Sequence, residues 1–122
     1  MRKYLFILLL FPFYSFAQGL INNGAYIVVS NGSNIYIDGA TGNYNNTNSG
    51  LISNSSAGST ITILGNWINN GGNAAFNNDG ATVRFSGATQ SIGGSNSSTF
   101  YNVNLVGSGA KTLNINTSVG GI

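Results

Sequence analysis

Short segments in which apolar and polar residues alternate recur along most of this chain. In Thr60–Ile63 the two isoleucines face one way and the two threonines the other, and Asn102–Leu105 and Leu113–Asn116 repeat the pattern. Ile35–Ile37 and Val83–Phe85 likewise place two apolar residues on either side of a central one. This two-residue period is typical of strands with one buried face. No stretch keeps helical spacing over the roughly ten residues that a helix needs, so we predict an all-β chain.

Clusters of Gly and Asn separate the apolar segments, and two folds compete for this pattern. Asn-Gly and Asp-Gly pairs between short apolar runs favour hairpins and hence an antiparallel β-sandwich. Matched strand lengths for a hairpin occur at Tyr26–Ser30 and Asn34–Asp38, joined through Asn31–Ser33. The competing fold is a parallel β-solenoid, in which each strand stacks on its equivalent one coil further along the chain.

Internal repeats favour the solenoid. Gly19–Gly24, Gly50–Asn54 and Asn66–Gly71 share a core of an apolar residue, Ile, a polar residue and Asn. From Ile61 onward, apolar centres recur about every 8 to 11 residues. Two or three such strands would build a coil of roughly 20 to 30 residues, which is within the range of known solenoids. We therefore predict a parallel β-solenoid (β-helix) segment, with the antiparallel β-sandwich as the alternative.

The composition of residues 18–122 suits stacked coils. More than half of these residues are Asn, Gly, Ser or Thr, all of them uncharged. Parallel stacking brings equivalent positions to about 4.8 Å from one another. Like charges repel at that spacing, whereas stacked Asn side chains can form hydrogen-bonded ladders. We therefore expect neutral polar residues to support the stack.

The N-terminal segment has the organisation of an export signal. Arg2 and Lys3 provide a basic start, Tyr4–Tyr14 forms an apolar run, and a small-x-small sequence ends at Ala17. The alternative is a membrane anchor, but the apolar run is shorter than the roughly 20 residues that a span needs. We predict a signal peptide over 1–17 that is cleaved, and an exported segment over 18–122 that lies outside the cell or on its outer surface without inserting into a membrane.

Removal of this signal peptide changes the net charge of the chain. The whole chain has a formal net charge of +2. Without residues 1–17, Arg84 and Lys111 balance Asp38 and Asp79, so the net charge is zero. Nucleic-acid binding depends on several cations that neutralise phosphates, and two isolated cations do not provide them. We therefore expect no nucleic-acid partner.

Missing residue types exclude much catalytic chemistry. The chain has no His and no Cys, so it lacks imidazole bases, thiolate nucleophiles and the usual zinc ligands. Its two acids, Asp38 and Asp79, lie far apart in the sequence, whereas glycosidases need a carboxyl pair at a defined separation. We expect a non-enzymatic protein with no catalytic residues, no cofactor and no metal centre built from these ligands.

Several segments together resemble a known class of surface proteins. The segments that carry the resemblance are Gly65–Gly71, Ala81–Gly87, Gln90–Gly94, Thr99–Leu105 and Lys111–Ile115. They are similar to the strand repeats of large secreted adhesin-like proteins of Gram-negative bacteria that use type IX secretion. The resemblance implies an exported structural or adhesin-like scaffold. It also implies that this chain is the N-terminal piece of a longer protein, so that the remainder of its own chain is one expected partner.

A few side chains are candidates for ligand contact. Asp79, in the run Asn77–Gly80, is a candidate calcium ligand, because calcium takes oxygen ligands that include Asn and backbone carbonyls. The alternative for Asp79, and for Asp38, is a turn residue whose carboxylate caps backbone N–H groups. Trp67 and Tyr101 are candidates for stacking on surface glycans, alone or with other tyrosines, and the alternative for them is core packing. These other tyrosines are Tyr26, Tyr36 and Tyr44.

Two rival functions stay open at this point. One is the N-terminal part of a secreted β-helix polysaccharide-degrading enzyme whose acids lie beyond this sequence. The other is a small carbohydrate-binding module. A solenoid segment without covering caps would also expose a strand edge and an apolar coil face, so we expect the isolated segment 18–122 to aggregate or to be only marginally stable.

Overall fold

The computed structural model describes residues 19–121 except 40, 55–57, 73–75 and 78–79. The predicted signal peptide and Asp79 lie outside the described residues. Within them, every regular element is a β-strand, and every strand pair in the sheets is parallel. The chain therefore folds as an all-β parallel solenoid, as the repeats predict, and the antiparallel sandwich is wrong.

The strands form four sheets. Sheet A contains β1 (Gly19–Asn23), β4 (Asn43–Thr47), β7 (Trp67–Asn69), β10 (Gln90–Gly94) and β13 (Lys111–Leu113). Sheet B contains β2 (Tyr26–Val29), β5 (Leu51–Asn54) and β8 (Phe76–Asn77). Sheet C contains β3 (Asn34–Ile37), β6 (Thr60–Ile63), β9 (Thr82–Phe85) and β12 (Asn102–Leu105). Sheet D contains β11 (Ser98–Phe100) and β14 (Thr117–Val119).

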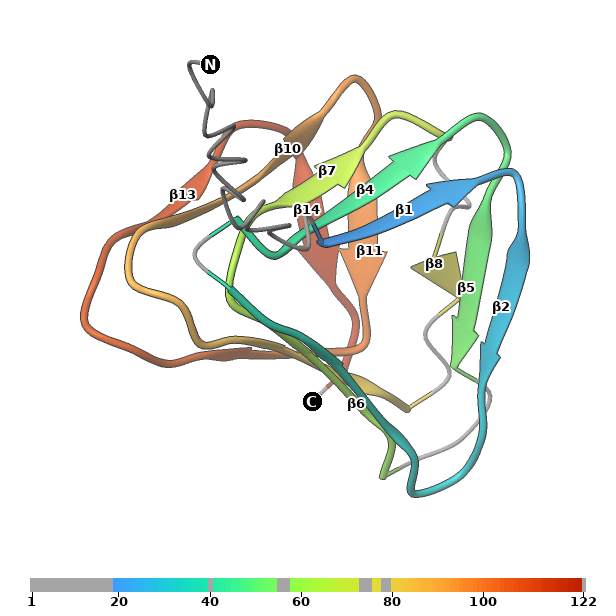
Figure 1. Ribbon diagram of the computed structural model, residues 1–122, viewed down its shortest axis with the longest axis horizontal. Coiled ribbons are helices and arrows are strands. Elements are labelled where there is room, and N and C mark those ends of the chain that lie inside the picture. The colour runs from blue at the N-terminus through green and yellow to red at the C-terminus, as the bar shows by residue number, and fades with distance from the viewer. Residues whose placement is uncertain (1–18, 40, 55–57, 73–75, 78–79, 122) are drawn as a thin grey trace, which may run out of the picture.

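Each of the first four coils takes one strand from each side of a three-sided stack, and the described part of the last coil takes two, β13 and β14 (Figure 1). The chain passes from sheet A to sheet B and then to sheet C before it returns to sheet A one layer further along. Sheet D follows sheet B, because β11 lies against β8. The sequence separation of paired positions gives the coil length, which is shortest between Ser98 and Thr117 and longest between Asn34 and Thr60. A coil therefore takes roughly 20 to 25 residues, in agreement with the length that the spacing of apolar centres predicts.

The segment that best fitted a hairpin turns a corner of the stack instead. β2 and β3 do not pair with each other; β2 pairs with β5, and β3 pairs with β6. Between them, the Ser33 N–H donates to the Ser30 carbonyl at 3.0 Å. This tight turn redirects the chain onto another side of the stack. A short turn between strands of similar length therefore does not distinguish a hairpin from a solenoid corner.

Two of the three repeated strings are structurally equivalent and the third is not. Leu20 and Trp67 occupy the same register position in sheet A, each one layer from Tyr44. Leu51–Asn54 is instead β5 of sheet B. Its isoleucine, Ile52, is fully buried, whereas the isoleucines of the other two strings are not among the buried residues. The same residue pattern therefore faces opposite ways in the two sheets: the residue before Ile points inward in sheet A, whereas Ile52 itself points inward in sheet B.

The predicted strand over Leu113–Asn116 is wrong beyond its first residue. β13 ends at Leu113, and β14 begins at Thr117 on another side of the stack. The polar residues of this segment lie in the corner between the two strands, so its alternation does not mark a single strand. The last coil is also short. The number of residues between paired positions is smaller for β10 and β13 and for β11 and β14 than for β1 and β4 or for β3 and β6.

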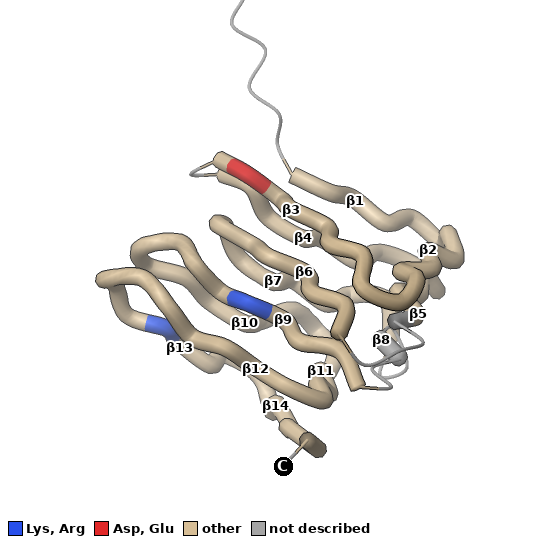
Figure 2. The backbone as a smooth tube through the Cα atoms, turned by 90° about the horizontal axis from the view of Figure 1, so that it is seen from below, with Lys and Arg blue, Asp and Glu red and all other residues tan. Residues whose placement is uncertain are grey.

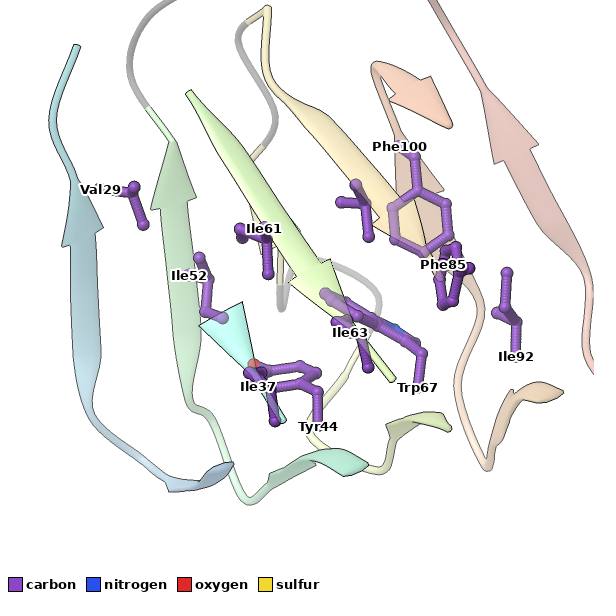
Figure 3. Close-up of a cluster of buried hydrophobic side chains, with 11 residues drawn as sticks. Val29, Ile37, Tyr44, Ile52, Ile61, Ile63, Trp67, Phe85, Ile92 and Phe100 are labelled. Carbon is purple, nitrogen blue, oxygen red and sulfur yellow. The ribbon is translucent and has the colours of Figure 1, made fainter. Parts of the chain in front are cut away.

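Aromatic rings continue from coil to coil through the interior (Figure 3). The ring centroids of Tyr44 and Trp67 are 4.3 Å apart, and those of Trp67 and Phe100 are 5.1 Å apart in an edge-to-face arrangement. Phe85 meets Phe100 edge-to-face at 6.1 Å. Such pairs add about 0.5–1.5 kcal/mol each beyond the burial of their apolar area. The rings therefore join three consecutive coils into one core, around which aliphatic side chains pack.

A column of buried asparagines lies at the corner between sheets A and B. Asn22, Asn46 and Asn69 occupy one register position in successive coils, and all three are buried. The Asn22 carbonyl oxygen Oδ1 accepts the Ala25 N–H at 2.9 Å, which fixes the turn into β2. One coil beyond Asn69 the position is Gly94, whose φ is 121° and whose Cβ, if present, would collide with the backbone of Asn69. The column therefore ends at Asn69.

Asn69 makes the most hydrogen bonds in this column. Its amide nitrogen Nδ2 donates to the carbonyls of Gly72 at 2.9 Å and Ser97 at 2.8 Å. Its Oδ1 accepts the Gly71 N–H at 3.1 Å and the Asn46 side chain at 3.4 Å. One side chain thus satisfies backbone groups in its own turn and in the turn of the next coil.

Other asparagines bond directly to the backbone of the following coil. Asn43 Oδ1 accepts the Asn66 N–H at 2.7 Å, and Asn66 Oδ1 accepts the Ser91 N–H at 2.8 Å. Asn70 Oδ1 accepts the Ser95 N–H at 2.9 Å. In each case the amide oxygen extends the hydrogen bonding of the parallel sheet beyond the strand itself.

We expect Asn69→Ala to destabilise the fold far more than Asn70→Ala. Loss of the Asn69 amide leaves buried backbone groups unpaired, at about 1–3 kcal/mol for each such group, so the free energy of unfolding should fall by about 3 kcal/mol. Asn70 is exposed and makes one bond to the next coil, so its loss should cost about 1 kcal/mol or less. Urea unfolding followed by the fluorescence of Trp67 measures both variants. Equal destabilisation would contradict the role assigned to the buried column.

Candidate functional site

Trp67 lies in the core and not on the surface. Its side chain is 1% exposed, and its indole Nε1 donates a hydrogen bond to Ser98 Oγ at 3.0 Å. The ring lies between those of Tyr44 and Phe100 (Figure 3). The ring therefore presents no face to a glycan at the surface. Of the two alternatives for Trp67, sugar stacking and core packing, the structure shows core packing.

The other sequence candidates for sugar stacking are dispersed. Tyr101 is 41% exposed, at the corner between β11 and β12. Tyr26 and Tyr36 are exposed on β2 and β3 of the first coil, whereas Tyr44 is buried. The structure therefore does not bring Trp67 and Tyr101 into one aromatic platform, and it leaves Tyr101 as the surface candidate of that pair.

Asp38 is positioned as a turn residue. Its carboxylate Oδ1 accepts the N–H of Gly39 at 2.6 Å, and Gly39 has a φ of 95° that an L-residue adopts only with strain. Asp79, the candidate calcium ligand, is outside the described residues. Within the described ranges, no group of three or more His, Cys, Asp or Glu side chains comes together.

The charged residues of the described part of the chain are spread along the stack (Figure 2). Asp38 follows β3 in the first coil, Arg84 lies on β9 in the third, and Lys111 lies on β13 in the last. Arg84 is exposed on sheet C, in register with Thr62 above and Asn104 below. A charge with neutral neighbours in both adjacent coils avoids the like-charge repulsion that stacking would otherwise impose.

Gln90 and Lys111 have a structural role that the sequence analysis missed. They are paired in register at the corner where the chain returns from sheet C to sheet A. Gln90 is buried, and its Nε2 donates to the carbonyls of Ile63, at 2.9 Å, and Gly65. Lys111 Nζ donates to the carbonyl of Gly87 at 2.8 Å one coil later. Both residues therefore satisfy carbonyls of the coil above their own.

The Lys111 ammonium makes further contacts at this corner. It also donates to the carbonyls of Ala88 at 2.7 Å and of Gly109 at 3.4 Å. Hydrogen bonds from a charged donor are roughly twice as strong as neutral ones. Lys111, whose positive charge could otherwise suggest a ligand-binding role, therefore connects two successive coils. The spacing between Gln90 and Lys111 is the only sequence signal of this role, and it has meaning only once the coil length is known.

Tyr44 carries a buried hydroxyl that has no hydrogen bond of good geometry, and the Asn22 side chain is the polar group that interacts with it. Burial raises the pKa of this hydroxyl from 10.0 to about 12, because the core cannot solvate the phenolate, and the nearby Asn22 amide opposes the rise only in part. The Asn22 Nδ2 and Asn46 Oδ1 atoms are also buried without a partner. This interior point between the first two coils is therefore the least satisfied polar region of the asparagine column.

Comparisons with known proteins give no family for this geometry. No protein-family model, curated protein or solved structure matches the chain. Among the described residues, no helix is both long enough and apolar enough to cross a membrane. Function is therefore argued from the arrangement of the coils and from the sequence.

We expect Tyr44→Phe to remove part of the loss of stability at high pH. Between pH 10 and about pH 12 the hydroxyl ionises in the unfolded chain but stays protonated in the folded one. The unfolded state then binds fewer protons, so stability falls as pH rises, by about 1.4 kcal/mol per pH unit. Urea midpoints measured across this range should fall less steeply for Tyr44→Phe than for the wild type, while Tyr36→Phe, on an exposed ring, should keep the wild-type slope. Equal slopes for Tyr44→Phe and the wild type would refute the assignment.

Proposed function

We propose that this chain is a non-enzymatic structural segment of an exported, adhesin-like protein, in which stacked coils act as a spacer or stalk at the cell surface. The observation that carries the proposal is the use of polar side chains to join one coil to the next. Asn43, Asn66 and Asn70 bond to the backbone of the following coil, and Gln90 and Lys111 bond to the carbonyls of the preceding one.

These bonds support a structural role because they engage groups that could otherwise contact a ligand. Even the Lys111 ammonium donates to three backbone carbonyls. On the outer surface, the hydroxyls of Thr99 on β11 and Ser118 on β14 form a hydrogen bond of 2.9 Å. Polar chemistry arranged in this way resists separation of the coils, which is what a spacer under load requires.

The sequence supports export as the setting for this role. Residues 1–17 combine a basic start, an apolar run and a small-x-small ending. The strand segments resemble those of adhesin-like surface proteins. A fold without cysteine needs no disulfide formation and is held by burial and by hydrogen bonds of the backbone and of polar side chains.

We expect a Gram-negative host to export the full chain and to remove residues 1–17. Fractionation with a C-terminal epitope tag should place the protein outside the cytoplasm, and mass spectrometry should find Gln18 as its first residue. Leu9→Arg, in the apolar run, should leave an unprocessed cytoplasmic protein, whereas Leu51→Arg lies outside the signal and should leave processing unchanged. A wild-type chain that stays in the cytoplasm with Met1 in place would contradict export. Sugar release from a panel of polysaccharides in proportion to the exported protein would contradict the non-enzymatic role and favour a polysaccharide-degrading enzyme.

Contact with surface glycans is a second part of this proposal, and the exposure of Tyr101 favours it. Aromatic rings offer an apolar face and a polar hydroxyl to a partly hydrated ligand. On a glycan array, we expect Tyr101→Ala to weaken binding by about tenfold, which corresponds to about 1.4 kcal/mol. Tyr26→Ala, which removes an exposed ring on another side of the stack, is the matched control. No binding by the wild type, or an equal loss in both variants, would argue against a glycan site at Tyr101.

A further inference from the structure

Arg84 is a charged residue to which the fold gives no structural partner. The Asp38 carboxylate accepts the Gly39 N–H, and the Lys111 ammonium donates to backbone carbonyls. Arg84 makes no hydrogen bond and no ion pair with any described residue. It is exposed on β9, an inner strand of sheet C (Figure 2). The five N–H donors of its guanidinium are therefore available to a ligand.

Arg84 lies within two straight columns of outward side chains, which we call the sheet C face. One column contains Tyr36, Thr62, Arg84 and Asn104, and the other contains Asn34, Thr60, Thr82 and Asn102. Ile61 and Val83, which lie between the columns, are fully buried, so the residues on either side of them point away from the core. All eight residues are exposed or partly exposed. Every one of them carries a hydrogen-bonding group.

The fold leaves these hydrogen-bonding groups unused. Within the described part of the chain, the side chains of the sheet C face make no hydrogen bond. On sheet A, by contrast, the outward amides of Asn43 and Asn66 bond to the backbone of the following coil. On sheet D, the hydroxyls of Thr99 and Ser118 bond to each other. Polar side chains therefore connect coils in sheets A and D, whereas those of the sheet C face remain available for binding.

The chemistry at Arg84 favours a carboxylate on a largely neutral ligand. A guanidinium binds a carboxylate through two parallel hydrogen bonds. Nucleic acids and other polyanions require several cations, whereas Arg84 is the one cation of this face. Thr62 and Asn104 lie in register above and below it, about 4.8 Å away, and offer neutral donors and acceptors. This arrangement fits carboxylates that are separated by uncharged hydroxyl-bearing groups.

Tyr36 adds a surface for a sugar ring in the same column. It lies two layers above Arg84, which is about 10 Å in a parallel sheet and close to the length of a disaccharide. Its side chain is 63% exposed, and an aromatic ring combines an apolar face with a polar hydroxyl. One sugar chain running along the stack can therefore contact Tyr36 with a ring and Arg84 with a carboxylate.

We propose that the sheet C face binds a linear acidic polysaccharide in which uronate sugars alternate with neutral ones. Arg84 binds a uronate carboxylate, Tyr36 stacks on a sugar ring, and the threonines and asparagines of the two columns bond to sugar hydroxyls. This site goes beyond the spacer role proposed above. It rests neither on export nor on Tyr101, so it can fail without affecting them.

The first test removes each partner of the Arg84 contact in turn. Isothermal titration calorimetry of the full chain at low ionic strength should detect binding of a hyaluronan octasaccharide, a chain with this alternation. Arg84→Gln should weaken binding by about tenfold, and Arg84→Lys, which keeps the charge but loses the planar fork, should weaken it less. The methyl ester of the same octasaccharide lacks the charge and should bind wild type and Arg84→Gln equally weakly. No binding by the wild type, or equal affinity for octasaccharide and ester, would overturn the proposal.

A second set of controls separates this site from a general attraction of anions. Ile21 is an outward residue of sheet A that is 60% exposed, so Ile21→Arg restores the net charge of Arg84→Gln on another side of the stack. The double variant should bind as weakly as Arg84→Gln alone. Recovery of affinity in the double variant would overturn the proposal. Equal wild-type affinity for poly-glutamate would also overturn it, in favour of an acidic peptide.

The last test uses two tyrosines of the first coil that differ in the side of the stack. Tyr36 is 63% exposed on sheet C and Tyr26 is 64% exposed on sheet B. Tyr36→Ala should weaken octasaccharide binding by roughly threefold to tenfold, and Tyr26→Ala should bind as the wild type does. Equal effects of the two variants would overturn the proposal. Circular dichroism and thermal melting check that each variant is folded, and Tyr36→Thr, which matches Thr62 in the next coil, replaces Tyr36→Ala if the latter is unfolded.

Discussion

The repeated register of parallel coils is the constraint on which the rest of this structure depends. Each residue lies about 4.8 Å from the residue at the same position in the next coil, so a side chain has to be compatible with its own equivalents. Tyr44, Trp67 and Ile92 satisfy this condition in one column by packing apolar groups on one another. Asn22, Asn46 and Asn69 satisfy it in another column with amides that can both donate and accept. A column of acids or of lysines would fail in either place because of like-charge repulsion.

The same constraint explains how much of the fold the sequence predicts. The period-two alternation of Thr60–Ile63 identifies a strand because one side is buried and the other is not, and the spacing of apolar centres sets the coil length. The side of the stack on which a strand lies depends on the phase of its alternation and on its register with distant strands. Leu20-Ile21 and Leu51-Ile52 have the same letters but turn opposite members inward: Leu20 is partly buried beside exposed Ile21, whereas Ile52 is fully buried. The turn at Asn31–Ser33 is equally uninformative, since a tight turn suits both a hairpin and a corner.

The candidate site was harder to predict than the fold for a related reason. In Trp67-Ile68-Asn69 each of the three side chains is compatible with an inward position, so the sequence does not say which of them packs in the core. The structure buries Trp67 and Asn69, and it leaves Tyr101 on the surface. The role of Lys111 was equally hard to predict, because a lone cation in a neutral sequence suggests a surface charge. Only its register with Gln90 shows that both side chains donate to backbone carbonyls at the same corner of the stack.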